Sequence, residues 1–417
     1  MKKQLTYLIF LCCLVACTPE QPEFVNFDLQ VEGAFIPTSH STVDFTKPLP
    51  PMPSLPGAEP ETPTDTTGSV RHASSLSAAV VVQSMLGFTQ SSKAHQIAGQ
   101  YTSVDQNGDS ISLSGKIVLP EKGPVRNIVL VSHYTIGANY EAPSQTFPIE
   151  GILAGHGYCV IVADYIGFGA TAHLPHPYMA GELTATNVID LYFAALPYLK
   201  AINRAPEDPA IYLMGYSQGG ATTMTVQYLL ERDHYEEVTI KRNFAGAGPY
   251  DLAATYDKWM ADDITGIPCA VPMIIQGMNI ADNLGLDYSI FFKPNLLDSY
   301  EELINSKKYT VAQIGNKMGV NRLSDIVTEE CRNKRTESSF KLYRALMRNS
   351  IAYLWTPESP VYMFHSQDDD TVPFENSVKA RQQYTDCNVE YNFGHYGSHM
   401  KGYLTFIYIV DKLLKQS

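Results

Sequence analysis

Two kinds of hydrophobic pattern alternate along this chain. Residues 127–133 (NIVLVSH) and 158–165 (YCVIVADY) are continuous apolar, mostly β-branched runs, as expected of strands buried on both faces of a parallel sheet. Residues 182–201 instead keep apolar positions at helical spacing, with a predicted kink at Pro197. The C-terminal residues 402–417 also place their apolar side chains on one helical face. This alternation predicts an α/β fold built on a mostly parallel, doubly wound sheet.

Further elements fit the same scheme. Residues 95–120 read as two strands joined through Asn107-Gly108, a strong hairpin signal, and residues 145–156 as a helix. Additional strands are expected at residues 211–215 (IYLMG), 242–248 (RNFAGAG) and 360–366 (PVYMFHS).

Residues 252–349 interrupt this alternation. They carry mostly helical signals between two predicted strands, among them SYEELINSKK and SSFKLYRALMRN. We predict a helical cap inserted over the active site, which would exclude water and shape the substrate pocket. The alternative is a group of helices that only packs on the sheet edge.

The N-terminus has the features of an export signal. Lys2 and Lys3 precede a short apolar run at residues 5–15, too short to span a bilayer. The run ends in LVAC, which resembles the lipobox of bacterial lipoproteins and would make Cys17 the acylated first mature residue; an ordinary secretory signal is the alternative. Thr18 follows, so an aspartate that would retain the protein at the inner membrane is absent and the outer membrane is the expected location.

These features divide the chain into three parts. We expect a lipoprotein signal peptide at residues 1–17, an N-terminal segment with a Pro-rich tether at 18–74, and the catalytic domain at 75–417. The tether prediction rests on KPLPPMPSLPGAEPETPTDTTG at residues 47–68, which has too few large apolar residues to form a core.

Charge and cysteine usage narrow the function. The formal net charge is −13, and no basic stripe interleaves with aromatic residues, so nucleic acid is excluded as a partner. The cysteines beyond the signal show no C-x-x-C spacing, which argues against structural zinc. A disulfide between Cys269 and Cys331 is conceivable, but buried free thiols are the simpler interpretation.

The candidate nucleophile lies in GYSQG, between a predicted strand and a predicted helix. Gly-x-Ser-x-Gly in this setting is the nucleophile elbow of α/β-hydrolases, with Ser217 at the turn. The backbone is strained there, and glycines two residues to either side avoid collisions with the neighbouring strand and helix. The backbone N–H of Gln218 is then the expected first donor of an oxyanion hole.

A serine hydroxyl needs a base, and the base needs an acid that holds its tautomer. After the strand at residues 360–366, the sequence QDDDTVP resembles a common acid motif, and alignment on Val372-Pro373 selects Asp369. Asp368 and Asp370 are the competitors, since either could cap the next helix.

Two histidines precede the last helix, where this fold places its base. The sequence Gly397-Ser398-His399 selects His399 as the base, and His395 would then line the pocket. The second oxyanion donor is expected after the strand at residues 127–133, where the backbone N–H of Tyr134 is our candidate.

Together these motifs resemble the secreted lipase family of fungal lipase A-like enzymes and related bacterial esterases. The resemblance covers residues 96–417 except the cap and rests on the motifs SHYTIG, ADYIGFG, HPY, GYSQGG and AGPYDL. It implies that Asp164 fixes a loop and is not the catalytic acid. It also makes His173 and His176 loop residues, although either could edge the pocket.

We therefore expect a lipid-anchored serine esterase of the bacterial cell envelope with the α/β-hydrolase fold. It would cleave carboxylic esters, of lipids or of acylated glycans and small molecules, through an acyl-enzyme on Ser217, without metal or cofactor. A serine peptidase could use the same triad, but no propeller or amine-anchoring glutamate motif is evident. A binding lipoprotein that has lost catalysis is the third possibility, and the candidate serine, aspartate and histidine argue against it.

Overall fold

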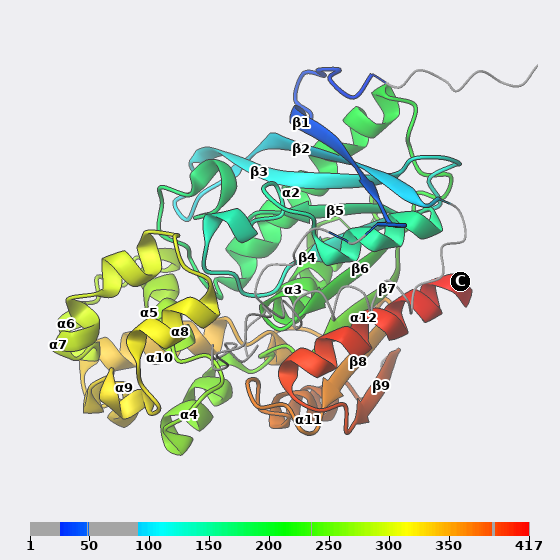
Figure 1. Cartoon of the computed structure of the whole chain (residues 1–417). Coiled ribbons are helices and arrows are strands. Elements are labelled where there is room, and N and C mark those ends of the chain that lie inside the picture. Colours follow the sequence, from blue (N-terminus) through cyan, green and yellow to red (C-terminus); the bar gives the residue numbers. More distant parts are fainter. Residues whose placement is uncertain (1–25, 48, 50–90, 235, 386–387, 417) are drawn as a thin grey trace, which may run out of the picture.

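The fold is an α/β sheet with helices on both faces and a helical unit at one end (Figure 1). It comes from a computed structural model that describes residues 26–47, 49, 91–234, 236–385 and 388–416. The signal peptide, Cys17 and most of the predicted tether lie outside the described residues. No helix in the described part of the chain is both long enough and apolar enough to cross a membrane.

The sheet has nine strands in the order β1-β2-β3-β5-β4-β6-β7-β8-β9. The strands β1, β2 and β3 pair antiparallel, and β3 is also antiparallel to β5. The remaining strands, β5, β4, β6, β7, β8 and β9, run parallel to one another. Their bounds are β1 Ile36–Asp44, β2 Lys93–Val104, β3 Ser110–Pro120, β4 Ile128–Ser132, β5 Cys159–Ala163, β6 Ile211–Tyr216, β7 Ile240–Gly246, β8 Val361–Ser366 and β9 Val389–Gly394. The prediction of a mostly parallel α/β sheet is confirmed.

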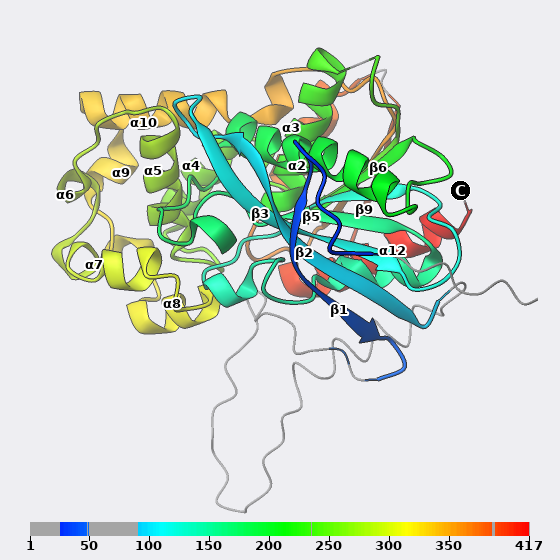
Figure 2. The ribbon, with the colours of Figure 1, turned by 90° about the horizontal axis from the view of Figure 1, so that it is seen from above.

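Alternate side chains of the central strands pack into two separate hydrophobic cores, one on each face of the sheet. In β4, Ile128 and Leu130 pack with α2 (Gly181–Ala201) and α3 (Gln218–Asp233). Val129 and Val131 instead pack on the opposite face, with α12 (His399–Gln416) and the 3₁₀ helix Ile149–His156. Figure 2 shows α2 and α3 on one side of the strands and α12 on the other. Burial on both faces explains why these strands read as unbroken apolar runs.

The sequence analysis did not predict the two edge strands. β1 lies within residues 18–74, which we had assigned to the N-terminal segment and tether, yet it pairs with β2 from Ile36 to Asp44. Its sequence, IPTSHSTVD, is mostly polar because its side chains are largely exposed at the sheet edge. β9, at the opposite edge, is only partly buried. Neither strand carries the continuous apolar signal of a central strand.

Residues 252–348 are predominantly helical, as the pattern predicted. The helices are α4 Leu252–Asp262, α5 Ala270–Ala281, α6 Tyr288–Phe291, α7 Pro294–Leu297, α8 Val311–Met318, α9 Glu329–Asn333 and α10 Glu337–Arg348, with a π-helical turn at Glu301–Asn305. They enclose a hydrophobic core of their own that includes Trp259, Ile274 and Phe292.

This helical unit contacts loops that follow the carboxyl ends of the parallel strands. The Trp259 indole N–H donates to the Thr371 carbonyl after β8 (2.9 Å). The Asn139 N–H, after β4, donates to the Lys307 carbonyl (2.8 Å). These loops are where an open α/β sheet forms its active site.

Candidate active site

Ser217 occupies a strained turn between β6 and α3. Its φ of 59° and ψ of −124° lie outside the regions usual for a residue with a side chain. A Cβ on Gly215 would collide with the backbone of Gly219, and a Cβ on Gly219 with the carbonyl of Ser132. The two glycines are therefore required by packing, and the turn presents Ser217 at the carboxyl end of β6.

Asp369 and His399 form a direct hydrogen bond. The distance from His399 Nδ1 to Asp369 Oδ2 is 2.6 Å, and both side chains are buried. A carboxylate only accepts, so the proton lies on Nδ1 and leaves Nε2 of a neutral ring as an acceptor. Among the described residues His399 Nε2 has no hydrogen-bond partner, although it is buried. The unpaired nitrogen is the atom that a catalytic base would use.

The surroundings of Asp369 keep it ionised. Its other oxygen accepts from the backbone N–H groups of Thr371 (2.9 Å) and Val372 (2.8 Å). Burial alone would raise the pKa of Asp369, but the charge that His399 and His365 carry when protonated, together with their hydrogen bonds, holds it well below its usual range.

The ring of His399 lies beside the nucleophile elbow. Tyr216, which directly precedes Ser217, donates its hydroxyl to the His399 carbonyl (2.7 Å), and the two rings are 4.9 Å apart. The His399 backbone N–H donates to Asp370 Oδ1 (3.1 Å), which fixes the start of α12. Residues from β6, the loop after β8 and α12 therefore converge at one point.

The predicted oxyanion donors lie on two adjoining loops. Gln218 is the first residue of α3, so its N–H has no acceptor within that helix. Tyr134 lies in the loop after β4. This loop approaches the elbow closely, because a Cβ added to Gly219 would lie 2.9 Å from the carbonyl oxygen of His133, the residue before Tyr134. Glu141 Oε2 holds this loop by accepting from the N–H groups of Gly137 (3.0 Å) and Ala138 (2.9 Å).

A comparison with protein families identifies the family of this chain. The model of the secretory lipase family matches residues 143–406, more than half of the chain. The chain belongs to the secretory lipase family. Export is in keeping with that family, and the family makes this chain a hydrolase of the lipase and esterase type. A search of the curated proteins finds no match.

Solved structures share the fold of this secretory lipase. The rice cell wall degrading esterase LipA from Xanthomonas oryzae superposes with a TM-score of 0.70 at 21% identity, over 81% of this chain and 96% of that chain. A putative hydrolase from Legionella pneumophila gives 0.69 at 20% identity, covering 81% and 94%. Candida antarctica lipase A gives 0.57 at 16% identity, covering 73% of each chain.

In this lipase the competing residues are separated from the buried pair. His395 Nδ1 lies 2.8 Å from Asp368 Oδ1, and 74% of the His395 side chain is exposed. Of the candidate residues, Asp369 and His399 therefore form a buried pair, whereas Asp368 and His395 form a pair at the surface. Asp370 contributes only a backbone contact to His399.

The Asp164 side chain joins strand β3 to the loop that follows β4, and it does not belong to the buried Asp369–His399 pair. Its buried carboxylate accepts from the Ser114 hydroxyl (2.6 Å) and the Ser144 N–H (2.7 Å). His173 is exposed, whereas His176 is buried with Nδ1 2.6 Å from the Ile166 carbonyl. His176 Nε2 lies 3.3 Å from the side-chain nitrogen of Gln218, so His176 borders the site.

The sequence analysis gave no role to three residues that shape the site: His365 beneath Asp369, Tyr216 against His399, and Lys307 from the helical unit. Nothing in a single sequence marks them, because each acts through a tertiary contact. Cys159, Cys269 and Cys331 are free and buried, so Cys269 and Cys331 are not bridged and the free-thiol interpretation is confirmed for these three; Cys387 lies outside the described residues.

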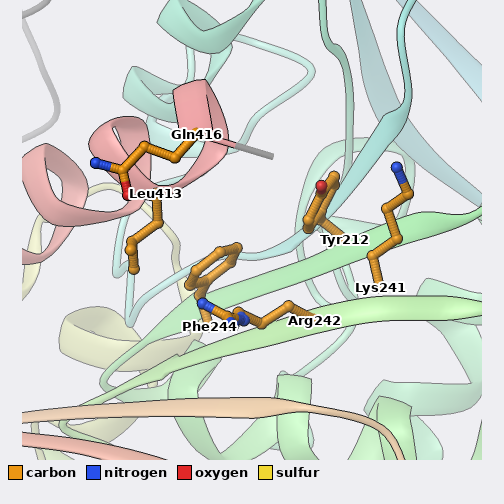
Figure 3. Close-up of a pocket in the computed structure, with 6 residues that line it drawn as sticks. All are labelled: Tyr212, Lys241, Arg242, Phe244, Leu413 and Gln416. Atoms are coloured by element: carbon orange, nitrogen blue, oxygen red, sulfur yellow. The ribbon is translucent and has the colours of Figure 1, made fainter.

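A hollow seen in Figure 3 is distant from this site. Tyr212, Lys241, Arg242, Phe244, Leu413 and Gln416 line it. Tyr212 lies near the start of β6, whereas Ser217 follows the end of the same strand. The hollow is therefore at the amino ends of the parallel strands, away from the candidate chemistry.

Proposed function

We propose that the protein is a serine carboxylic-ester hydrolase that works through an acyl-enzyme. Ser217 is the nucleophile, His399 the base and Asp369 the residue that orients His399. The observation that carries this proposal is the buried Asp369–His399 hydrogen bond beside a strained Ser217, with His399 Nε2 left without a partner. Family membership supports the same reaction class.

In the first half-reaction, His399 Nε2 takes the hydroxyl proton as Ser217 Oγ attacks the ester carbonyl. The negatively charged carbonyl oxygen is stabilised by the backbone N–H groups of Gln218 and Tyr134. The C–O bond to the alcohol then breaks, and the alcohol leaves with the proton from Nε2. Water repeats these steps on the acyl-enzyme and releases the acid.

We also propose that the mature protein is anchored in the cell envelope by acyl chains on Cys17. The basis is the lipobox-like LVAC at residues 14–17 and the Pro-rich stretch at 47–68, which would act as a spacer. Labelling of the cells with an alkyne fatty acid tests this. Cys17→Ser should abolish labelling, whereas Cys13→Ser should not; labelling that persists in Cys17→Ser would contradict the anchor.

A series of p-nitrophenyl esters, from acetyl to long acyl chains, tests the reaction. The full chain should hydrolyse at least part of the series, and Ser217→Ala should lower kcat by about 10⁴-fold or more. A fluorophosphonate probe should label the wild type at Ser217 only. The preferred chain length would distinguish a lipase from a short-chain esterase, and absence of Ser217-dependent turnover on every ester would overturn the proposal.

A further inference from the structure

The helical unit places a buried, unpaired lysine beside the active-site loops. Lys307, which follows the π-helical turn, is only 6% exposed. Its ammonium nitrogen lies 4.9 Å from the centre of the Phe168 ring, and none of the described residues offers that nitrogen a hydrogen bond or an ion pair. Its own carbonyl is held by Asn139 of the loop after β4 (2.8 Å). The side chain is therefore trapped between the helical unit and the sheet domain.

An unpaired ammonium in this position is costly. Burial lowers the pKa of Lys307 to about 8, and the nearest opposing charge, Glu301, compensates only in part. The cation–π contact with Phe168 offers only a modest electrostatic attraction in return. Lys307 is nevertheless still protonated at neutral pH, so a positive charge with no ion-pair partner in the described part of the chain remains between the helical unit and the sheet.

A second buried lysine shows how such a group is normally satisfied. Lys116 has the same pKa of about 8 for the same reason, burial, but its ammonium donates to the Thr146 carbonyl and to Gln96 Oε1 (3.1 Å). Lys116 is a structural lysine with acceptors inside the fold. Among the described residues Lys307 has no such acceptor, so an anion bound from solution can supply one.

Contacts lead from Lys307 to the nucleophile. The Phe168 ring lies 5.1 Å from the ring of His176, and His176 Nε2 lies 3.3 Å from the Gln218 side chain, directly after Ser217. Burial, and next the charge of Lys307, lower the pKa of His176 to about 3, so His176 stays neutral and does not compete for an anion. Phe168 and His176 thus connect Lys307 to the residue that follows the nucleophile.

We propose that Lys307 is a specificity residue that binds a carboxylate carried by the ester substrate. The preferred substrates are then esters with a free carboxylate near the scissile bond, on either the acyl or the alcohol half. Binding would replace a buried unpaired cation by a charge-assisted hydrogen bond. This inference rests on the proposed ester hydrolysis and specifies its substrate class.

Matched substrate pairs test the inference in the wild-type enzyme. For the acyl half, the p-nitrophenyl monoester of glutaric acid is compared with p-nitrophenyl 5-methylhexanoate, which has the same shape without the charge. For the alcohol half, 4-carboxyphenyl butyrate is compared with 4-isopropylphenyl butyrate. In each case the rate of Ser217→Ala is subtracted, since the glutarate ester also reacts spontaneously.

We expect kcat/KM to favour the carboxylate in one of the two pairs by about tenfold or more. That preference should fall to about one in Lys307→Met, which keeps the length of the side chain, and should persist in Lys308→Met, whose lysine is exposed and pairs with Glu302. The substrate pair that shows the carboxylate preference identifies whether Lys307 binds the acyl half or the alcohol half of the substrate.

Each result has a defined meaning. Turnover of the neutral esters without any carboxylate preference overturns the Lys307 proposal and leaves the proposed reaction intact. A preference that survives in Lys307→Met also overturns it. Absence of Ser217-dependent turnover in all four esters overturns the proposed reaction and, with it, this inference. If Lys307→Met does not fold, the wild-type comparison of the two pairs still decides.

Discussion

At the scale of single residues, the buried carboxylate of Asp369 is the most constrained group of the candidate site. Two backbone N–H groups hold one oxygen, while His399 and His365 approach the other at 2.6 Å and 3.3 Å. The carboxylate therefore cannot rotate without breaking several contacts. This fixes the proton on Nδ1 of His399 and leaves Nε2 as the atom that would accept the Ser217 proton in the proposed reaction.

The surface pair Asp368–His395 provides a matched control for the buried pair. Asp369→Asn should lower kcat by about 10³- to 10⁴-fold, because an amide no longer enforces the Nδ1–H tautomer, and His399→Gln should be at least as damaging. Asp368→Asn and His395→Gln should stay within about twofold of the wild type, since both side chains are largely exposed. Steady-state kinetics on one p-nitrophenyl ester decide the matter, and a large loss in the surface variants would reverse our assignment.

At the scale of elements, Asp263 joins distant parts of the helical unit. It follows α4 and accepts from the N–H (2.7 Å) and hydroxyl (2.7 Å) of Ser324, from Arg322 (2.6 Å), and from Arg332. One buried carboxylate thereby ties the end of α4 to the residues around α9. No periodic pattern could reveal such a hub, because its partners lie far away in the sequence.

Removal of this hub should destabilise the helical unit. Asp263→Ala should lower the free energy of unfolding by about 2–4 kcal/mol, because Arg332 and the Ser324 groups lose a charged acceptor. The neighbouring Asp262→Ala should change it by less than about 0.5 kcal/mol, since Asp262 is half exposed and pairs only with Lys258 at the surface. Urea unfolding followed by fluorescence measures both variants, and equal effects would contradict the hub.

The contribution of Asp263 should also depend on pH. Burial would raise its pKa, but hydrogen bonds from Ser324 and Arg322 and the charge of Arg332 lower it from 3.8 to about 2. A depressed folded-state pKa means that the stabilisation is complete above about pH 4 and disappears as the pH falls through about 2. The stability difference between wild type and Asp263→Asn should therefore be constant from about pH 7 to about pH 5 and shrink below about pH 4.

At the scale of the whole molecule, the sheet is completed by a strand from the N-terminal segment. Phe35 and Phe45, at the two ends of β1, are fully buried. Phe35 packs against the Tyr198 ring (5.5 Å) and over Gly99, where any Cβ would collide with it. Phe45 lies against Phe147 on the other side of the sheet (6.1 Å). The catalytic domain therefore begins well before residue 75.

Truncation of the N-terminal segment should show that the sheet domain depends on β1 and its two flanking phenylalanines for stability. Deletion of residues 1–49 removes both phenylalanines and β1, whereas deletion of residues 1–25 removes none of the described residues. We expect the longer deletion to lose solubility or more than about 5 kcal/mol of stability, because each buried phenylalanine contributes about 3–5 kcal/mol. The shorter deletion should keep the melting temperature of the full chain. Ile36→Ala, at a residue that is 45% exposed, is the control beside Phe35→Ala; equal melting temperatures for these two variants would contradict the model.

The sequence by itself determined the central architecture and the candidate chemistry. Strands buried on both faces, such as β4 and β5, are readable because their apolar runs are continuous, and the elbow around Ser217 because only glycines fit beside it. Membership in a lipase family agrees with that interpretation. Catalytic roles for Ser217, Asp369 and His399 stay predictions until the variants above are measured.

Only the tertiary structure decided what depends on neighbours distant in the chain. Edge strands β1 and β9 are only partly buried, so neither has a continuous apolar run: β1 is mostly polar, and β9 (VEYNFG) alternates apolar and polar residues over a short length. Sequence motifs selected Asp369 and His399, but the burial of this pair and the exposure of Asp368 and His395 are visible only in the fold. Lys307 likewise looks like any surface lysine until the fold buries most of the residue against Phe168, with no ion-pair partner among the residues that the structure describes. The spacing of apolar residues in the sequence indicates which side of a strand or helix is buried. Which charged groups pair with each other depends on their distance in the folded structure, which the sequence does not show.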